Sequence, residues 1–285
     1  MDIYDPFGQN KKKKKSQIDK KLYALIAAGF TLVLIFSIIF MIKQDNPLGG
    51  EEVKSTTAGE AEEETSALPK SDSYYLFWVT DADNKELEFL WVARLRMPKC
   101  SLSVYSPSTQ DLIVDDESSY RIGDYYSLYG SKQFVTAMEK NYGIKFANYM
   151  GSTAPMFRQM VNSIGGVTLD VKHQISYSDK FNLVLGKGEN YIKGELLYRY
   201  LEYVGFAEEF ELSDRSEVLI DIFESVFVPA NSNKANSIFS QITNNMISDI
   251  TIVTFSEKSD ELNYLYEHGL SSAKAESTIE GLKRG

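Results

Sequence analysis

Three acidic residues near the first strongly apolar run are candidate metal ligands. Asp81 and Asp83 follow the run YYLFWVT at residues 74–80, and Glu88 stands at the beginning of the next run, LEFLWVARLRM. Carboxylate oxygens are the hard ligands that Mg²⁺ prefers. These three residues therefore form a candidate magnesium site, with Mg²⁺ as the expected cofactor if the protein is active and none otherwise. The alternative is that they are turn residues, because residues 80–84 are polar and short enough for a tight turn.

Arg215 is a candidate ligand for phosphate. It follows Asp214 at the start of a long apolar pattern that predicts a helix, and the backbone amides of a helix N-terminus favour anions. A local ion pair between Arg215 and Asp214 is the favoured alternative.

The sequence lacks the motifs of common hydrolases and of phosphate-binding loops, and it cannot form an intrachain disulfide. Cys100 is the single cysteine, which excludes an intrachain disulfide and is most simply a buried structural thiol. The two histidines, His173 and His268, have no catalytic-triad context, and there is no G-x-S-x-G or H-E-x-x-H motif. Residues 186–188 (GKG) lack the Ser or Thr of a phosphate-binding loop. An unrelated secreted hydrolase is therefore the least favoured class of function.

An uncharged apolar stretch organises the chain. Residues 22–42 contain no charge, and as a helix they would span roughly 31 Å, the thickness of the bilayer core. Lysines at 11–15, 20 and 21 precede the stretch and acidic residues soon follow it, so the positive-inside rule places the N-terminus in the cytoplasm. The sequence therefore predicts a single-pass protein of the cell membrane, with a basic cytoplasmic tail at 1–21 and an extracellular C-terminal domain.

The charge of the outer part excludes one class of partner. The chain has 30 Lys and Arg residues and 40 Asp and Glu residues. The part after residue 43 contains 22 of the basic and 37 of the acidic residues, which gives it a net charge of −15. Such a surface disfavours sequence-independent binding of nucleic acid. We expect no nucleic-acid partner, and assign the lysines at 11–15 to topology and attraction to the inner leaflet.

The outer part predicts a linker followed by one α/β domain. Residues 43–73 are acidic and lack an apolar period, so they predict a flexible linker. Apolar alternation predicts strands at 74–80, 87–97, 101–105 and 167–171; in the second, Leu87, Phe89, Trp91 and Ala93 share a face. Helical periods predict helices at 132–142, 154–164, 195–204, 218–227 and from 234 onward. Ser131 is expected to cap the first of these helices, and Asp214 and Glu217 have the spacing of a capping box before the fourth. We therefore expect an α-β-α sandwich with a mixed sheet at 74–270 and a C-terminal tail at 271–285.

Three stretches together resemble the LytR-CpsA-Psr family, membrane-anchored enzymes of mainly Gram-positive bacteria. The most specific is 157–171, where an apolar helix, Gly165-Gly166-Val167 and the strand VTLDV are similar to the family's helix, "GGV" and strand. Residues 125–130 and 141–144 resemble its aromatic turn and its Gly-Ile step, and Lys193-Gly194-Glu195 with Tyr198 and Tyr200 resembles its "G-E-x-A-L-x-Y" helix. The resemblance implies an α-β-α fold and transfer of glycopolymers from a polyprenyl-pyrophosphate carrier to peptidoglycan.

The chain departs from the family at its catalytic arginines. Ser108 and Thr109 stand where the family has Arg-Asp, Glu202 and Val204 stand at its "R-x-R" pair, and only Arg215 matches its "R-x-x-R-Q" motif, whose first arginine falls on Leu212. Asp81 and Glu88 match or replace its acidic residues. Losing three phosphate-binding arginines would forfeit roughly 4–9 kcal/mol, or about three to six powers of ten in rate.

Two functions follow from the resemblance. The leading hypothesis is a degenerate, noncatalytic family member in cell-envelope assembly that binds a polyprenyl-phosphate-linked glycopolymer, peptidoglycan or an active paralogue. The rival is an active phosphotransferase for teichoic acid or capsular glycopolymer, in which Arg94, Arg121 or Arg199 joins Arg215 as phosphate ligands.

The apolar helix stripes predict where a carrier lipid would lie. The family holds its polyprenyl chain between sheet and helices, and the inward stripes here remain apolar. The expected groove residues are Phe134, Met138, Phe157, Met160, Val161, Leu219 and Phe223. The alternative is that these side chains fill the space as ordinary core.

Overall fold

The computed structural model describes residues 70–284, and the predicted membrane-spanning stretch and most of the predicted linker lie outside that range. Among residues 70–284, no helix is both long and apolar enough to cross a membrane. The strands are β1 (Ser71–Thr80), β2 (Leu87–Met97), β3 (Ser101–Tyr105), β4 (Leu112–Asp115), β5 (Ser118–Arg121), β6 (Phe146–Thr153), β7 (Val167–Val171), β8 (Ile175–Ser178), β9 (Leu183–Leu185), β10 (Gly188–Ile192), β11 (Ile247–Ser248) and β12 (Ser272–Glu276). The helices are α2 (Ile122–Tyr142), α3 (Ala154–Ser163), α4 (Gly194–Val204), α5 (Leu212–Val226), the 3₁₀ helix η1 (Pro229–Lys234), α6 (Ala235–Asn245), α7 (Ile252–Glu257), α8 (Ser259–His268) and α9 (Ile279–Arg284).

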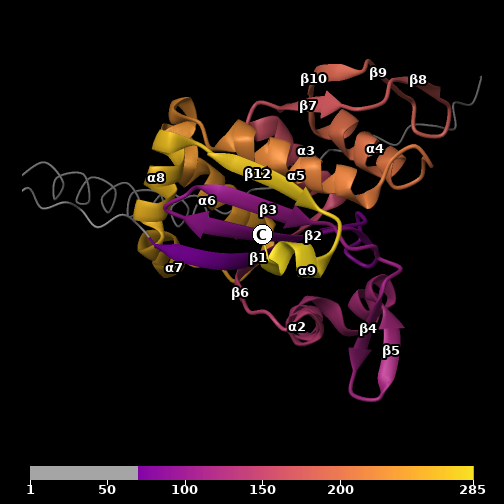
Figure 1. The fold of residues 1–285 in the computed structure, drawn as a ribbon, viewed down its shortest axis with the longest axis horizontal. Helices are drawn as coiled ribbons and strands as arrows, with labels where there is room; N and C mark the ends of the chain where they lie inside the picture. The colour runs from indigo at the N-terminus through magenta and orange to yellow at the C-terminus, as the bar shows by residue number, and fades with distance from the viewer. Residues whose placement is uncertain (1–69, 285) are drawn as a thin grey trace, which may run out of the picture. The chain divides into compact units, whose positions relative to one another are not determined.

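A mixed sheet forms the centre of the described chain, in the order β11-β6-β1-β2-β3-β12. The β1–β6 and β3–β12 pairs are parallel and the other pairs are antiparallel. Helices α3, α4 and α5 lie over one face, and α2 lies on the other (Figure 1). The mixed sheet flanked by helices confirms the predicted α/β class.

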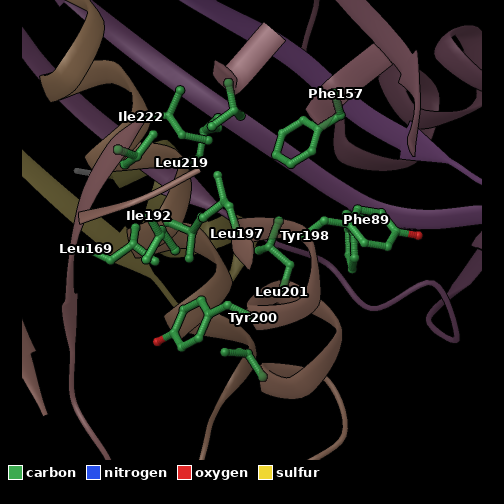
Figure 2. Close-up of a cluster of buried hydrophobic side chains, with 14 of the residues drawn as sticks. Phe89, Phe157, Leu169, Ile192, Leu197, Tyr198, Tyr200, Leu201, Leu219 and Ile222 are labelled. Atoms are coloured by element: carbon green, nitrogen blue, oxygen red, sulfur yellow. The ribbon is translucent and has the colours of Figure 1, made fainter. Parts of the chain in front are cut away.

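Strand alternation divides the apolar side chains between two cores. Phe89, Trp91 and Ala93 face the helices α3, α4 and α5, while Leu76 and Trp78 face α2. The first core contains Leu197 and Leu201 of α4 and Leu219 and Ile222 of α5 (Figure 2). This core joins the helices that carry the charged residues described below to the middle of the sheet.

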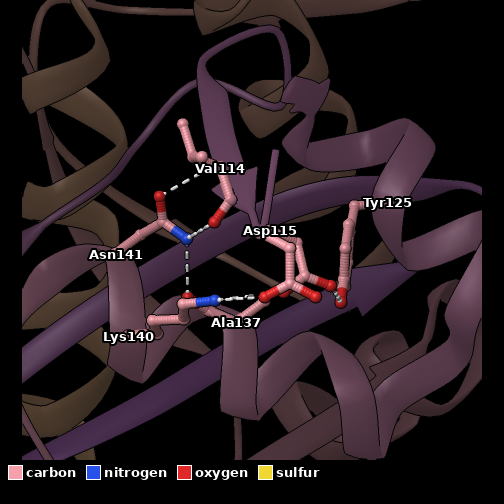
Figure 3. Close-up of polar contacts among 7 residues, drawn as sticks. Val114, Asp115, Tyr125, Ala137, Lys140 and Asn141 are labelled. Carbon is pink, nitrogen blue, oxygen red and sulfur yellow. Dashed lines mark hydrogen bonds and ion pairs between the residues drawn. The ribbon is translucent and has the colours of Figure 1, made fainter. Parts of the chain in front are cut away.

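A short hairpin, β4–β5, is fastened to α2 by polar contacts that the sequence did not predict. Asn141 Nδ2 donates to the carbonyls of Val114 at 2.8 Å and Ala137 at 2.9 Å, and the Val114 amide donates back to Asn141 at 2.7 Å (Figure 3). Tyr125 donates to Asp115 at 2.8 Å, and Lys140 pairs with the same carboxylate at 3.4 Å. Side chains of α2 therefore fasten the hairpin by polar contacts, and its Ile113 is buried in the core between α2 and the sheet.

The predicted C-terminal tail is wrong, and helices α2 and α5 extend further toward the N-terminus than their apolar patterns indicated. The expected tail at 271–285 instead supplies β12, which pairs with β3, and α9, whose Leu282 is fully buried. The helix expected from 132 does begin just after a break, because Gly130 has φ 73° and ψ 178°; an additional helical segment, which begins at Ile122 with Arg121 at its N-cap, precedes that break. The predicted stop at Gly143 is correct, since this residue has φ 61°. The capping box of α5 is formed by Glu211 and Asp214, one turn before the predicted pair.

Candidate functional site

A β-bulge directs Glu88 toward the α4 side of the sheet. Val79 pairs with Phe89 and Thr80 pairs with Leu87, so Glu88 is an extra residue without a partner on β1. A bulge locally reverses the facing of a strand and often redirects a side chain next to a functional site. It also explains why Leu87 packs with the α2 core, although alternation had placed it beside Phe89.

Tyr198 and Arg158 meet Glu88 at this end of the sheet. The Tyr198 hydroxyl donates to Glu88 Oε2, and the Arg158 guanidinium carbon lies 4.2 Å from the centre of the Tyr198 ring. Phe89 packs edge-on against Tyr198, with ring centres 5.4 Å apart (Figure 2). Burial is the main cause that raises the pKa of Glu88, and the Tyr198 hydrogen bond opposes it. Glu88 is thus a half-buried carboxyl group that holds its proton to a higher pH than an exposed glutamate does.

Two further carboxyl groups lie at this end, and one of them forms ion pairs with both arginines. Glu195 Oε2 lies 3.2 Å from Arg158 Nε, and Glu195 Oε1 lies 2.9 Å from Arg199 Nη2. Burial raises the pKa of Glu202, while the charges of Arg158 and Arg199 lower it. We call Glu88, Arg158, Glu195, Tyr198, Arg199 and Glu202 the Glu88 cluster. Its three carboxyl groups outnumber its two arginines, so an anion must compete with the chain's own carboxylates.

Arg215 is separated from the Glu88 cluster by the Phe89 ring. Its guanidinium carbon lies 5.2 Å from the ring centre, and its Nε donates to the Leu201 carbonyl at 3.3 Å. Burial lowers the pKa of Arg215 to about 10, so it remains a cation at neutral pH. The predicted ion pair with Asp214 is wrong, because Asp214 instead binds Lys172 Nζ at 2.7 Å. Within residues 70–284, the Arg215 guanidinium has no carboxylate partner.

The other predicted phosphate ligands do not converge on one place. Arg94 donates to both carboxylate oxygens of Asp72 at 2.7 Å and to the Lys283 carbonyl at 2.6 Å, so it ties β2 to α9. Arg121 is exposed on the β4–β5 hairpin, on the α2 side. Of the predicted arginines, Arg199 belongs to the Glu88 cluster and Arg215 lies across Phe89 from it.

The predicted magnesium ligands do not form a metal site. Asp81 Oδ1 accepts the backbone amides of Lys85 at 2.6 Å and Glu86 at 3.0 Å, and Asp83 lies 3.8 Å from Lys85 Nζ. The side chain of Asp81 therefore serves the turn between β1 and β2. Between residues 70 and 284, no group of three or more His, Cys, Asp or Glu residues has a geometry that could hold a metal. The residues present do not fit Mg²⁺, and we assign no step to this ion.

Two adjoining apolar cavities run between the sheet and helices α5 and α6. The first has a volume of about 150 Å³ and reaches Val79, Trp91 and Phe157, at the end of the sheet where the Glu88 cluster lies. The second has a volume of about 180 Å³ and reaches Tyr75 and Phe255 at the other end. They share the lining residues Phe77, Met150, Phe223, Val226, Phe227, Ile238 and Ile242. Because they share one wall, we treat them together as an apolar channel along β1; Lys258 and Glu261 border its second cavity.

Part of the predicted groove lines this channel. Phe157, Met160, Leu219 and Phe223 border the first cavity, and Val161 is buried in the same core. Phe134 and Met138 are wrongly included, because α2 carries them on the opposite face of the sheet. The core on the channel side is therefore not completely filled, whereas Phe134 and Met138 are fully buried on the other side.

Sequence reasoning missed Arg158 and Glu195. The i,i+4 spacing of Glu195 and Arg199 was a usable signal, since such pairs meet on one helix face. Arg158 had no such signal, because its position depends on how closely α3 approaches α4. A Cβ at Gly194 would collide with the backbone of Arg158, so only glycine permits that approach.

Asp221 is another carboxyl group whose pKa is raised above the ordinary value. It lies on the face of α5 that packs against β7. Burial, followed by the charges of Glu224 and Glu217, raises the pKa of Asp221 to about 7. The folded state therefore binds this proton more tightly than the unfolded chain, so stability falls as the pH rises from about 4 through 7. The lost stability is about 1–3 kcal/mol after allowance for partial exposure.

We expect Asp221→Asn to raise the melting temperature at pH 8 by about 2–8 °C and to change it little at pH 4. The asparagine mimics the protonated carboxyl at every pH. Thermal unfolding followed by the fluorescence of the buried Trp78 and Trp91 measures the difference. Asp179→Asn, at an exposed site, is the matched control. An equal gain at both pH values would contradict the titration of Asp221.

Comparison with known proteins identifies relatives of this fold. The model of the LytR_cpsA_psr family matches residues 104–281. The solved structure of TagV from Bacillus subtilis superposes with a TM-score of 0.59 at 16% identity, covering 76% of this chain and 94% of TagV. TagT bound to LI-WTA gives 0.55 at 16% identity, covering 72% and 78%, and a protein from Streptococcus agalactiae gives 0.58 at 15%, covering 71% and 76%. No curated protein matches the sequence.

Proposed function

This chain belongs to the LytR_cpsA_psr family, and from that premise we propose that it is a membrane-anchored, extracytoplasmic protein of cell-envelope assembly that binds a polyprenyl-linked glycopolymer with lost or altered catalysis. The observation that carries the proposal is the apolar channel, whose first cavity is lined by Phe157, the sequence neighbour of Arg158 in the Glu88 cluster. A long apolar tail fits a channel lined by aromatic and aliphatic side chains, and a polar head group then lies near the Glu88 cluster.

Altered catalysis is supported by the charges at that end. Arg158 and Arg199 both form ion pairs with Glu195, and by the sequence resemblance Glu202 stands where the family motif has an arginine. A pyrophosphate would meet three carboxyl groups as well as two arginines, so its negative charge gains less there than in a purely basic site. The partner classes that fit are a polyprenyl-linked glycopolymer, peptidoglycan and an active family member.

Lipid extraction tests the binding role. The full chain, purified in detergent, should carry a polyprenyl phosphate in near-stoichiometric amount by mass spectrometry, and added polyprenyl phosphate should raise its melting temperature. Val226→Trp places an indole where the two cavities meet, and it should weaken this binding at least about tenfold by filling the channel. Val184→Trp, on the exposed face of β9, is the matched control. Lipid that remains bound to Val226→Trp would exclude the channel as its site.

An active phosphotransferase is the second candidate. The observation in its favour is that Arg158 and Arg199 lie with Glu88 and Tyr198, and that Arg215 remains a buried cation nearby. Incubation of the full chain with a polyprenyl-pyrophosphate glycan and an acceptor distinguishes the two. Transfer well above background that Arg158→Ala abolishes would favour the enzyme.

A further inference from the structure

The first two residues of α7 expose adjacent large apolar side chains. Ile252 is 76% exposed and Val253 is 65% exposed. Among residues 70–284, only one other pair of sequence neighbours, Leu128 and Tyr129, consists of two exposed large apolar residues. Resting on the membrane anchoring proposed above, we propose that Ile252 and Val253 insert into the surface of the lipid bilayer that anchors the chain.

Strand register places α7 at the end of the sheet where the described chain begins. β1 and β6 are parallel, with Tyr74 opposite Phe146, so both strands start at this end. β11 runs antiparallel to β6, and Asp249 accepts the Tyr149 amide at 2.9 Å, which carries the chain back toward the start of β6. α7 and the beginning of β1 consequently lie together at one end of the sheet (Figure 1).

The length of the preceding segment keeps this end near the membrane. Residues 43–69 separate the apolar stretch at 22–42 from the start of the described chain. The linker predicted from the composition of these residues would have a root-mean-square reach of about 30 Å, comparable to the diameter of a small domain. The sheet end that carries α7 is thus the end tied closest to the lipid.

The segment that carries the exposed pair also lines the second cavity. Ile250, Thr254 and Phe255 face it, and Phe255 stacks on Phe239 of α6 with ring centres 4.2 Å apart. Thr251 and Thr254 form a reciprocal capping box at the first turn, with bonds of 2.6 Å and 3.2 Å. Phe255 therefore fixes α7 from inside, while Ile252 and Val253 remain turned outward.

The charges around α7 define the kind of contact. Asp249, Glu257 and Asp260 are acidic, and Lys258 is already paired with Glu261 at 2.8 Å. This surface does not favour anionic lipid, so the contact is apolar and should form on a neutral bilayer with little dependence on salt. Two apolar side chains bind a bilayer weakly alone, but tethering raises their effective concentration at the surface.

Fluorescence in nanodiscs tests the contact. The full chain is reconstituted into phosphatidylcholine nanodiscs at one chain per disc, with an environment-sensitive fluorophore on Ile252→Cys, Val253→Cys or the exposed control Val184→Cys. Cys100 is buried, and the unsubstituted chain measures its background labelling. At positions 252 and 253 we expect a blue-shifted emission and quenching by doxyl-labelled lipid at least about twofold stronger than at position 184.

Each alternative result has a distinct meaning. Equal quenching at positions 252 and 184, in a chain that stays in the disc, would overturn this inference and leave the anchoring intact. A blue shift that grows with chains per disc, without quenching by doxyl lipid, would assign the pair to contact with a second copy and overturn it as well. A chain released from the lipid by an alkaline wash would overturn the anchoring and this inference together.

Discussion

Replacing Gly194 by alanine is expected to lower the free energy of unfolding by about 2–4 kcal/mol, because the new methyl group would overlap the backbone of α3. The added Cβ would collide with the carbonyl oxygen, Cα and carbonyl carbon of Arg158. Backbone atoms cannot swing aside as the tip of a flexible side chain can. The Gly194 amide also donates to Asn162 Oδ1 at 3.0 Å, which holds the two helices at this short separation.

The same substitution should disturb the Glu88 cluster. Arg158 reaches the Tyr198 ring from α3, while Tyr198 and Glu195 lie on α4. Any separation of these helices moves the guanidinium away from both partners. Gly194→Ala is therefore expected to weaken binding of a polyprenyl phosphate in addition to lowering stability.

Thermal unfolding followed by tryptophan fluorescence measures the effect, and a decrease of about 5–15 °C is expected for a domain of this size. Gly186→Ala is the matched control, since an added Cβ there meets no atom within 4 Å. It should leave the melting temperature unchanged or raise it slightly through reduced freedom of the unfolded chain. A Gly194→Ala variant as stable as Gly186→Ala would refute the close approach of α3 and α4.

The secondary structure was predictable where apolar periodicity is strong. The strands at 74–80, 87–97 and 167–171 and the helices at 154–164 and 195–204 were expected within a few residues of their bounds. Ser272–Glu276 was missed because its sequence SAKAE is weakly apolar; it is a strand because β3 offers a parallel edge. Its strand conformation depends on pairing between Ser272 and Ser101, which are 171 positions apart, and no local sequence pattern indicates such a partner.

The candidate site was less predictable from the sequence, because its residues are positioned by an irregularity in a strand pair and by contacts between elements that are distant in the sequence. The bulge that redirects Glu88 is one residue of mismatch between β1 and β2, and the alternation of β2 alone gives no sign of it. Arg94 was a reasonable phosphate candidate by residue type, but Asp72 and the α9 carbonyls already satisfy it. Arg158 enters the cluster through the glycine contact between two helices. Residue types defined the candidates, and tertiary contacts selected among them.

Arg215 combines a cost in stability with a potential gain in binding. Burial lowers its pKa to about 10, which means that the folded protein holds the charge less favourably than water does. The unfolded chain keeps the ordinary, higher pKa, so this cost is fully present at neutral pH and decreases only as the pH rises above about 10. The Phe89 ring and the Leu201 carbonyl compensate the charge only in part. An anionic ligand would supply the missing partner.

Arg215→Met is expected to leave the melting temperature unchanged or to raise it, because methionine has a similar reach and no charge to desolvate. The same variant should bind polyprenyl phosphate about 10- to 100-fold more weakly, since a charge-assisted hydrogen bond to phosphate contributes about 1.5–3 kcal/mol. Thermal unfolding and lipid titration of the full chain in detergent measure the two effects. Arg121→Met, which removes an exposed arginine from the β4–β5 hairpin, controls for the general loss of one positive charge and should change neither. A variant that loses stability but keeps its affinity for the lipid would make Arg215 a structural residue and remove it from the binding site.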